Sequence, residues 1–306
     1  MKIILKQPYS FLQLGKRENQ EDARFPNEDL PSPGQCYFMV CDGVGGNAAG
    51  EIASATVCEA IARYMEDEDL TRPFTADDFK NCLSYAYQQL YKEMRKRNCF
   101  DMATTLTFLC FHAHGGTIAH MGDSRVYHIR PERGILYKTN DHSLVNALVR
   151  SGNITPQEAI EHPQSNYITR CIAYVADDKS FPAADLYEFE DIAAGDYFFL
   201  CSDGVLHRLP DETLVTILSE PIEDRLKMEK IAALSKDSQD NNTAILIPIE
   251  ESNNQCFEER PPIDIDPEAE LSTQIIHENR SQIKEITPTL SQPLGTRIMD
   301  LIKNIF

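Results

Sequence analysis

Short runs of apolar and β-branched residues alternate with polar turns along most of the chain, and this pattern predicts β-strands. The runs cover residues 10–15, 35–41, 103–112, 117–122, 126–130, 135–138, 185–190, 196–201 and 243–249. Turn signals at Gly116 and in the segments G-D-S and P-E-R-G separate the middle runs. Connections this short join antiparallel strands, so the pattern predicts mainly antiparallel sheets.

Apolar residues at helical spacing predict helices between these strands. Two helices are expected over residues 48–65 and 76–97, and further helices up to about residue 234. Residues 144–170 are predicted to form a polar, helical surface subdomain, with T-P-Q-E as a helix start and H-P as its stop. Because strands and helices do not alternate regularly, the expected class is an α+β layered sandwich rather than a doubly wound sheet.

The composition of the chain changes after residue 250. Ser, Asn, Gln, Pro and Glu dominate residues 251–293, which predicts a flexible polar linker after a domain at residues 1–250. Residues 294–306 then predict an amphipathic C-terminal helix, with one apolar face formed by Leu294, Ile298, Leu301, Ile302 and Ile305. We expect this helix to dock on its own domain or on a partner protein, with a frayed end as the remaining alternative.

The net charge of the chain limits the kinds of molecule that it is expected to bind. It has 29 Lys and Arg against 48 Asp and Glu, a net charge of −19 that disfavours nucleic acid and anionic membranes. Its 9 cysteines form no C-x-x-C pair and suit a reducing compartment. The first apolar run is too short for a signal-peptide core, and no stretch approaches ~18 apolar residues. We therefore expect a cytoplasmic protein that binds no membrane.

Acidic residues stand at the ends of several apolar runs. Asp42 follows Y-F-M-V-C, Asp203 follows Y-F-F-L-C-S, and Asp240 precedes N-N-T-A-I-L-I. Glu21 and Asp22 lie together in R-E-N-Q-E-D-A. Mg²⁺ and Mn²⁺ need several oxygen ligands, which carboxylates at strand ends can supply. The pattern predicts an enzyme with a site for two metal ions.

The segment D-G-V-G-G-N-A-A-G-E is the strongest local motif. Gly43 has no Cβ, so its carbonyl can turn toward a cation bound by Asp42. A glycine-rich turn before a helix is the alternative for this segment taken alone. A dinucleotide loop is disfavoured because the third glycine of G-x-G-x-x-G falls on Ala48. The second strand, Asp-Gly, helix pattern at Asp203 favours the metal site.

Over about residues 9–249 the chain resembles the metal-dependent serine/threonine phosphatases of the protein phosphatase 2C family. The motifs that carry the resemblance, in the family's order and spacing, are R-E-N-Q-E-D-A, V-C-D-G-V-G-G, A-T-T-L-T, M-G-D-S-R-V-Y, N-D-H-S, Y-I-T-R, L-C-S-D-G-V and D-N-N-T-A. The segments around D-H-S-L-V and N-Y-I-T-R are most similar to the flap region of the bacterial branch. The resemblance implies a four-layer αββα sandwich, with two central antiparallel β-sheets flanked by helices.

The resemblance also implies a ligand set for two Mn²⁺ or Mg²⁺ ions. Asp42 would bridge the two ions, and Asp203 and Asp240 would complete one site. Glu21 and the Gly43 carbonyl would help to complete the other.

Three further residues match functional positions of the family. Asp22 would hydrogen-bond a metal-bound water, and Arg17 would grip the substrate phosphate, for which a bidentate guanidinium is suited. Asp123 matches the carboxylate that holds a third, weaker cation together with Asp203 in bacterial members. An aspartate that caps a turn between two strands is the alternative for Asp123.

The activity that the resemblance implies is hydrolysis of phosphoserine and phosphothreonine in proteins by a water between two cations, reversing a serine/threonine kinase. A phosphatase-like regulatory module that has lost catalysis and recruits partners through its tail is the alternative. Because every matched carboxylate is present, the enzyme is favoured over this module. A two-metal nuclease needs a basic groove that this acidic chain does not indicate.

The chain departs from the family at a few positions. Val44 stands where many eukaryotic members have a histidine proposed as general acid, so the leaving-group proton must come from water or another group. Ala173 replaces the glycine of T-R-A-L-G and affects only the local turn. We expect His142 in N-D-H-S to be a hydrogen-bonded structural residue, because hard cations avoid imidazole when carboxylates abound. Three more histidines are expected to be ordinary strand residues: His112, His114 and His120.

Overall fold

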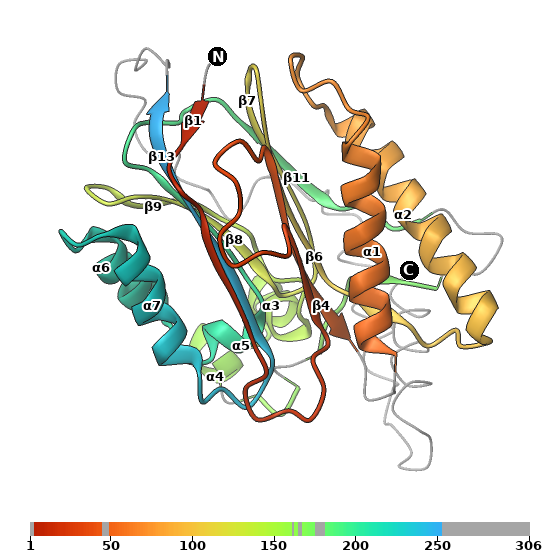
Figure 1. Ribbon diagram of the computed structural model, residues 1–306. Helices are drawn as coiled ribbons and strands as arrows, with labels where there is room; N and C mark the ends of the chain where they lie inside the picture. Colours follow the sequence, from red (N-terminus) through yellow and green to blue (C-terminus); the bar gives the residue numbers. More distant parts are fainter. Residues whose placement is uncertain (1–2, 45–48, 161, 165–166, 175–180, 253–306) are drawn as a thin grey trace.

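Two antiparallel β-sheets form the centre of the computed structural model, which describes residues 3–44, 49–160, 162–164, 167–174 and 181–252 (Figure 1). The first sheet has the order β1 (Ile3–Leu5), β13 (Asn242–Ser252), β12 (Tyr197–Cys201), β8 (Arg125–Arg130), β9 (Gly134–Lys138), with β2 (Tyr9–Gln13) on β13. The second has the order β10 (Ile172–Ala173), β5 (Ala103–Thr104), β4 (Tyr37–Val44), β6 (Leu106–His112), β7 (Gly115–Met121), β11 (Asp185–Phe189), with β3 (Asp22–Phe25) on β4.

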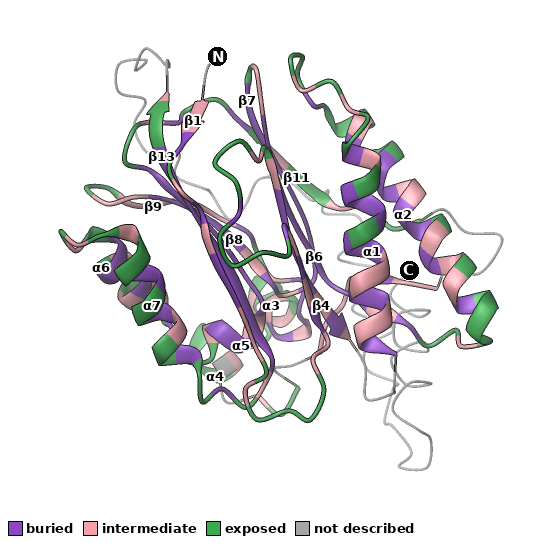
Figure 2. Ribbon diagram, in the orientation of Figure 1, coloured by how far each residue is buried: buried purple, intermediate pink, exposed green. Residues whose placement is uncertain are grey.

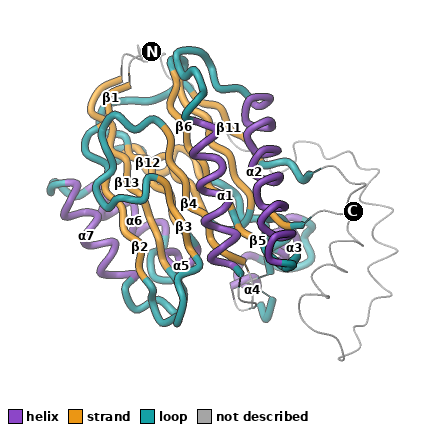
Figure 3. Tube along the Cα trace, turned by 45° about the vertical axis from the view of Figure 1, so that its right-hand side comes forward, coloured by secondary structure: helices purple, strands orange, loops and turns teal. Residues whose placement is uncertain are grey.

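Helices cover the outer faces of both sheets (Figure 3). On the second sheet lie α1 (Gly50–Met65) and α2 (Ala76–Arg97), and on the first lie α5 (Asp203–Leu206), α6 (Asp211–Ser219) and α7 (Asp224–Ser235). One apolar cluster lies under each helical layer, and a third lies between the sheets. The buried residues follow the strands and the inner helix faces in Figure 2. The predicted four-layer αββα sandwich is confirmed.

The alternation of side chains along β4 explains its sequence. Phe38 and Val40 pack between the sheets, whereas Met39 and Cys41 pack under α1 and α2. Because both faces are buried, the strand is a continuous apolar run rather than an alternating one. The next residue on the face between the sheets is Asp42, so the same periodicity that builds the core carries a carboxylate to its end.

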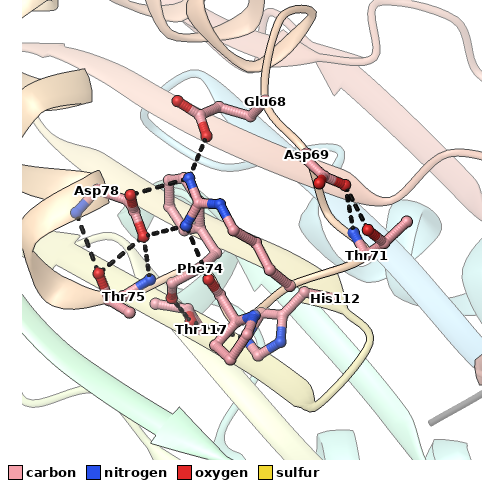
Figure 4. Close-up of polar contacts among 10 residues, drawn as sticks. Glu68, Asp69, Thr71, Phe74, Thr75, Asp78, His112 and Thr117 are labelled. Carbon is pink, nitrogen blue, oxygen red and sulfur yellow. Dashed lines mark hydrogen bonds and ion pairs between the residues drawn. The ribbon is translucent and has the colours of Figure 1, made fainter.

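Local polar contacts fix the start of α2 on the second sheet (Figure 4). The Thr75 hydroxyl accepts the Asp78 N–H at 3.3 Å, and the Asp78 carboxylate accepts the Thr75 N–H at 2.8 Å, a capping box. Arg72 donates to the same carboxylate at 2.8 Å. The Thr117 hydroxyl of β7 donates to the Phe74 carbonyl at 2.8 Å, which ties the helix entry to the sheet.

Most predicted elements are confirmed, and the helix over residues 76–97 has the predicted bounds. The strand predicted over 103–112 is interrupted at Thr105, whose hydroxyl accepts the Asp42 N–H at 2.9 Å and contacts the Ser124 hydroxyl at 2.8 Å. Three short strands were missed: β1, β3 and β10. Runs of two to four residues are too short to show a period in the sequence.

The helical prediction for residues 144–170 is wrong in its extent. Among the described residues of this range, only α3 (Leu144–Arg150) and α4 (Pro156–Ile160) are helical. After α4 the chain returns beside the start of α3, because Leu144 donates to the Tyr167 carbonyl at 2.8 Å and Ser143 forms a β-bridge with Ile168. These partners lie more than twenty residues apart along the chain, beyond the reach of a helical pattern.

The C-terminal predictions lie largely outside the described residues. Strand β13 runs to Ser252, and its last residues pair with β1. The polar linker predicted for residues 251–293 and the amphipathic helix predicted for residues 294–306 therefore remain predictions. Within the described ranges, no helix combines the length and apolar character that a bilayer span requires. The described cysteines all carry free thiols, and Cys256 lies outside these ranges.

Candidate active site

The candidate site lies at one end of the layer between the two sheets. The first residue of β3, Asp22, is directly opposite Asp42 of β4. From the end of β12, the Ser202 hydroxyl donates to Asp22 Oδ2 at 2.8 Å and accepts the Thr243 N–H of β13 at 3.0 Å. Four strands from both sheets thus converge, and Asp203 opens α5 immediately after Ser202. The start of α5 and the end of β4 share the lower end of the sandwich in Figure 1.

Arg17 and Asp240 meet at the rim of this site. Arg17 comes from the loop between β2 and β3, and Asp240 from the loop before β13. The Arg17 guanidinium donates to Asp240 Oδ2 at 2.6 Å, and the pair is partly exposed. Asp240 Oδ1 accepts the Asn241 N–H at 2.8 Å.

Asn241 holds the loop between β2 and β3 that carries Arg17 and Glu21, a role that sequence reasoning missed. Its Oδ1 accepts the Glu21 N–H at 2.8 Å, and its Nδ2 donates to the Leu14 and Asn19 carbonyls at 2.9 and 3.0 Å. The side chain therefore satisfies three backbone groups of one loop. The sequence signal that could have indicated this role is the asparagine that directly follows the candidate ligand in D-N-N-T, because Asn side chains often hydrogen-bond to nearby backbone groups.

Glu21 and the Gly43 carbonyl lie side by side near Gly50. A Cβ placed on Gly50 would be 3.2 Å from both Glu21 Cδ and Gly43 O. The Gly43 N–H donates to the Glu21 carbonyl at 3.1 Å, and the Ser54 hydroxyl donates to the same carbonyl at 2.5 Å. A Cβ on Gly43 would lie 2.5 Å from the Gly50 backbone, so only glycine fits there.

Burial and mutual repulsion raise the pKa values of the carboxyl groups between the sheets. Burial, with the charges of Asp203 and Asp240, raises the pKa of Asp22 to about 7. Burial, with Asp203 and Asp141, raises the pKa of Asp123 to about 8. The pKa of Asp42 is raised well above its usual range by burial and by the neighbouring aspartates.

The donor set fits hard cations. One carboxylate oxygen each of Asp22, Glu51, Asp123 and Asp203 is buried and has no hydrogen-bond partner among the described residues. Buried carboxylates that repel one another become favourable ligands when divalent cations neutralise them. In the described part of the chain, no three His, Cys, Asp or Glu side chains are already grouped around one point as a metal cage requires. The types of donor atom therefore fit a divalent cation, but the carboxylate side chains must move closer together to coordinate one.

One histidine reaches the carboxylate cluster, because His207 Nε2 lies 3.9 Å from Asp203 Oδ2. As predicted, His142 is buried and hydrogen-bonded at both ring nitrogens. His112 and His120 lie in β6 and β7, but the strand prediction for His114 is wrong, because it occupies the turn between them. Val44 ends β4 and pairs with Ala103.

Comparison with known proteins agrees with this fold and site. The family profile of protein phosphatase 2C matches residues 19–237, and the chain belongs to this family. It is 32% identical over 214 residues to the serine/threonine protein phosphatase PstP of Mycobacterium tuberculosis. It is 30% identical over 241 residues to the protein phosphatase PhpP of Streptococcus pneumoniae, covering 78% of this chain and 95% of that protein.

A solved structure gives the same picture. The catalytic domain of PstP in complex with two manganese ions superposes with a TM-score of 0.65 at 27% identity, covering 82% of this chain and 100% of that domain. The match to the full mycobacterial PstP covers 69% of this chain but only 39% of that protein's length.

Proposed function

We propose that this chain is a metal-dependent protein phosphatase that hydrolyses phosphoserine and phosphothreonine in proteins. The observation that carries this proposal is the cluster of Asp22, Asp42 and Asp203, in which Asp22 is buried and one carboxylate oxygen each of Asp22 and Asp203 has no hydrogen-bond partner among the described residues. The names of the relatives support the substrate class, and the manganese complex of PstP supports the cofactor.

The proposed cation ligands are those that the resemblance to the family implies. Asp42 would serve both cations, and Asp203 and Asp240 would help to hold one of them. Glu21 and the Gly43 carbonyl, which lie together near Gly50, would help to hold the other cation. Two Mn²⁺ ions held there would supply an activated water and neutralise charge on the phosphoryl oxygens. We propose that Mg²⁺ serves as an alternative to Mn²⁺.

The remaining residues act on the substrate and on the water. Arg17 binds the phosphate through its guanidinium, and it leaves Asp240 when it does so. Asp22, fixed by Ser202, orients the water through its free Oδ1. Asp123 would hold a third, weaker cation together with Asp203. Val44 has no proton that it can donate, so water or another group must protonate the leaving group.

The physiological setting is also part of the proposal. We propose a cytoplasmic enzyme that reverses a serine/threonine kinase, in line with the free thiols of the described cysteines. The acidic composition supports phosphoprotein rather than nucleic-acid substrates. The alternative of a lapsed regulatory module gains no support, since all the matched carboxylates are retained.

The test is metal-dependent release of phosphate from a phosphothreonine peptide. We expect turnover with Mn²⁺, loss of turnover after dialysis against EDTA, and recovery when Mn²⁺ is added back. The same peptide without phosphate, and a phosphotyrosine peptide, serve as substrate controls. Undiminished turnover in excess EDTA would refute a metal-dependent mechanism.

A further inference from the structure

His142 joins three parts of the structure near the candidate site. Its backbone N–H donates to the Gly122 carbonyl at 2.7 Å, and its ring Nδ1 accepts the Gly122 N–H at 3.1 Å. Its ring Nε2 lies 2.9 Å from Asp185 Oδ2 on β11. Its carbonyl accepts the Thr169 N–H at 2.7 Å, from the segment that returns after α4. A single residue therefore hydrogen-bonds to both backbone groups of Gly122 and also contacts β11 and the segment that returns after α4.

These contacts define the tautomer of the ring. A backbone N–H can only donate, so His142 Nδ1 must be the unprotonated acceptor from Gly122. Nε2 then carries the hydrogen and donates it to the Asp185 carboxylate. Arg170 binds the other oxygen of Asp185, so this carboxylate orients the ring from one side and holds the returning segment from the other.

Gly122 is the residue through which this contact reaches the site, because it directly precedes Asp123. Its φ of +115° is a conformation that side chains rarely adopt, and a Cβ there would lie 2.6 Å from Thr105 Cβ. On the other side of the turn, the Ser124 hydroxyl contacts the Thr105 hydroxyl at 2.8 Å. The Thr105 hydroxyl also accepts the Asp42 N–H. Asp123 is thus held between two anchored neighbours, with Thr105 on the side of Asp42 and His142 on the far side.

We propose that His142 is a positioning residue that fixes the Asp123 carboxylate through the Gly122 N–H, and that it does not touch substrate or cation itself. This inference rests on the role of Asp123 in the proposed function. The structure supplies the reason for a histidine here: the imidazole ring presents an acceptor at Nδ1 and a donor at Nε2, far enough apart to reach Gly122 and Asp185 at once.

Two substitutions separate the two ends of the ring. In His142→Asn, the amide oxygen takes the place of Nδ1 and keeps the contact to Gly122, whereas the contact to Asp185 is lost. In His142→Gln, the amide reaches Asp185 and the acceptor for Gly122 is lost. Each variant of the full chain is titrated with Mn²⁺ alone, with free Mn²⁺ measured by electron paramagnetic resonance. The step of interest is Mn²⁺ binding at the proposed third site, which is identified as the step that is lost in Asp123→Asn.

We expect His142→Gln to weaken this step by about 10- to 100-fold, as for other residues that orient a ligand, and His142→Asn to stay near wild type. In an Asp123→Asn background, His142→Gln should have no further effect on Mn²⁺ binding. His128→Gln is the matched control, because His128 is equally buried and pairs with Asp196 at 2.8 Å in the first sheet. It should lower the melting temperature in EDTA without weakening Mn²⁺ binding.

Three outcomes overturn the inference: equal weakening by His142→Asn and His142→Gln, unchanged binding in His142→Gln, or no binding step that depends on Asp123. If His142→Gln does not fold, His142→Leu, which also lacks an acceptor for the Gly122 N–H, takes its place and must weaken the same step, whereas Asp185→Ala at an exposed position should resemble His142→Asn. These titrations need no turnover. Intact Mn²⁺ binding without phosphate release by the wild type would refute the proposed function and leave the positioning role standing.

Discussion

Asp22 and Asp42 face each other directly across the antiparallel pair of β3 and β4. Like charges at directly opposed positions destabilise a sheet, and here both carboxyl groups are also buried. Two carboxylates held this close together favour the binding of a proton or a cation between them. The position of the pair at the end of the layer between the sheets therefore links the stability of the protein to its proposed chemistry.

The pKa of Asp22 gives a prediction on stability and pH in EDTA. Its folded-state pKa is raised to about 7, so the folded state holds a proton that the unfolded state releases near pH 4. The contribution to stability is full below the unfolded pKa and is lost as the pH rises through about 7. We expect Asp22→Asn to gain stability relative to wild type over this range, by on the order of a few kcal/mol.

Urea unfolding of both proteins at several pH values measures this difference. Comparing the two proteins cancels the contribution of His120, whose pKa is lowered by burial to about 3 and acts in the opposite direction. Saturating Mn²⁺ should remove the advantage of the variant. A stability difference independent of pH would contradict the raised pKa of Asp22.

Asp203→Asn and Asp240→Asn should each abolish turnover and leave the fold intact. Each change removes a ligand charge at nearly constant volume, and a lost cation ligand is expected to cost on the order of several kcal/mol of transition-state stabilisation. Phosphopeptide kinetics at saturating Mn²⁺ and thermal unfolding in EDTA measure the two effects. Asp67→Asn, exposed beyond the far end of α1, is the control. Near-wild-type kcat in either site variant would show that the ligand assignment is wrong.

Arg17→Lys should raise KM for a phosphopeptide more than it lowers kcat. Lysine keeps a positive charge near Asp240 but loses the planar pair of donors that matches two phosphate oxygens. Steady-state kinetics decide the matter, with the exposed Arg225→Lys on α7 as control. A fall in kcat alone would place the action of Arg17 in the transition state rather than in substrate binding.

Removal of residues 253–306 tests the predicted tail. The cut follows Ser252 because this residue still pairs with Ile3 of β1. A helix of about thirteen residues is marginal by itself in water, so we expect the apolar face at residues 294–306 to be buried on the catalytic domain or on a partner. Docking on the same chain predicts a lower melting temperature or altered activity, and docking on a partner predicts the loss of a co-purifying protein. A truncated chain that matches the full chain in all three measures ends the docking hypothesis.

The pattern of apolar and polar residues was sufficient to predict an α+β layered sandwich and the residue types of the site. Apolar runs with strand and helix periods place Asp42 and Asp203 at the ends of buried elements, because side-chain direction follows from local backbone geometry. The motif order was enough to indicate the family. The tertiary structure alone decided which groups meet: the pairing of Arg17 with Asp240, 223 residues apart, and the hold of Asn241 on the Glu21 loop. It likewise decided the contact of His142 with Gly122. Such partners depend on which strands become neighbours, and hydrophobic periodicity specifies the face of a strand but not its neighbour.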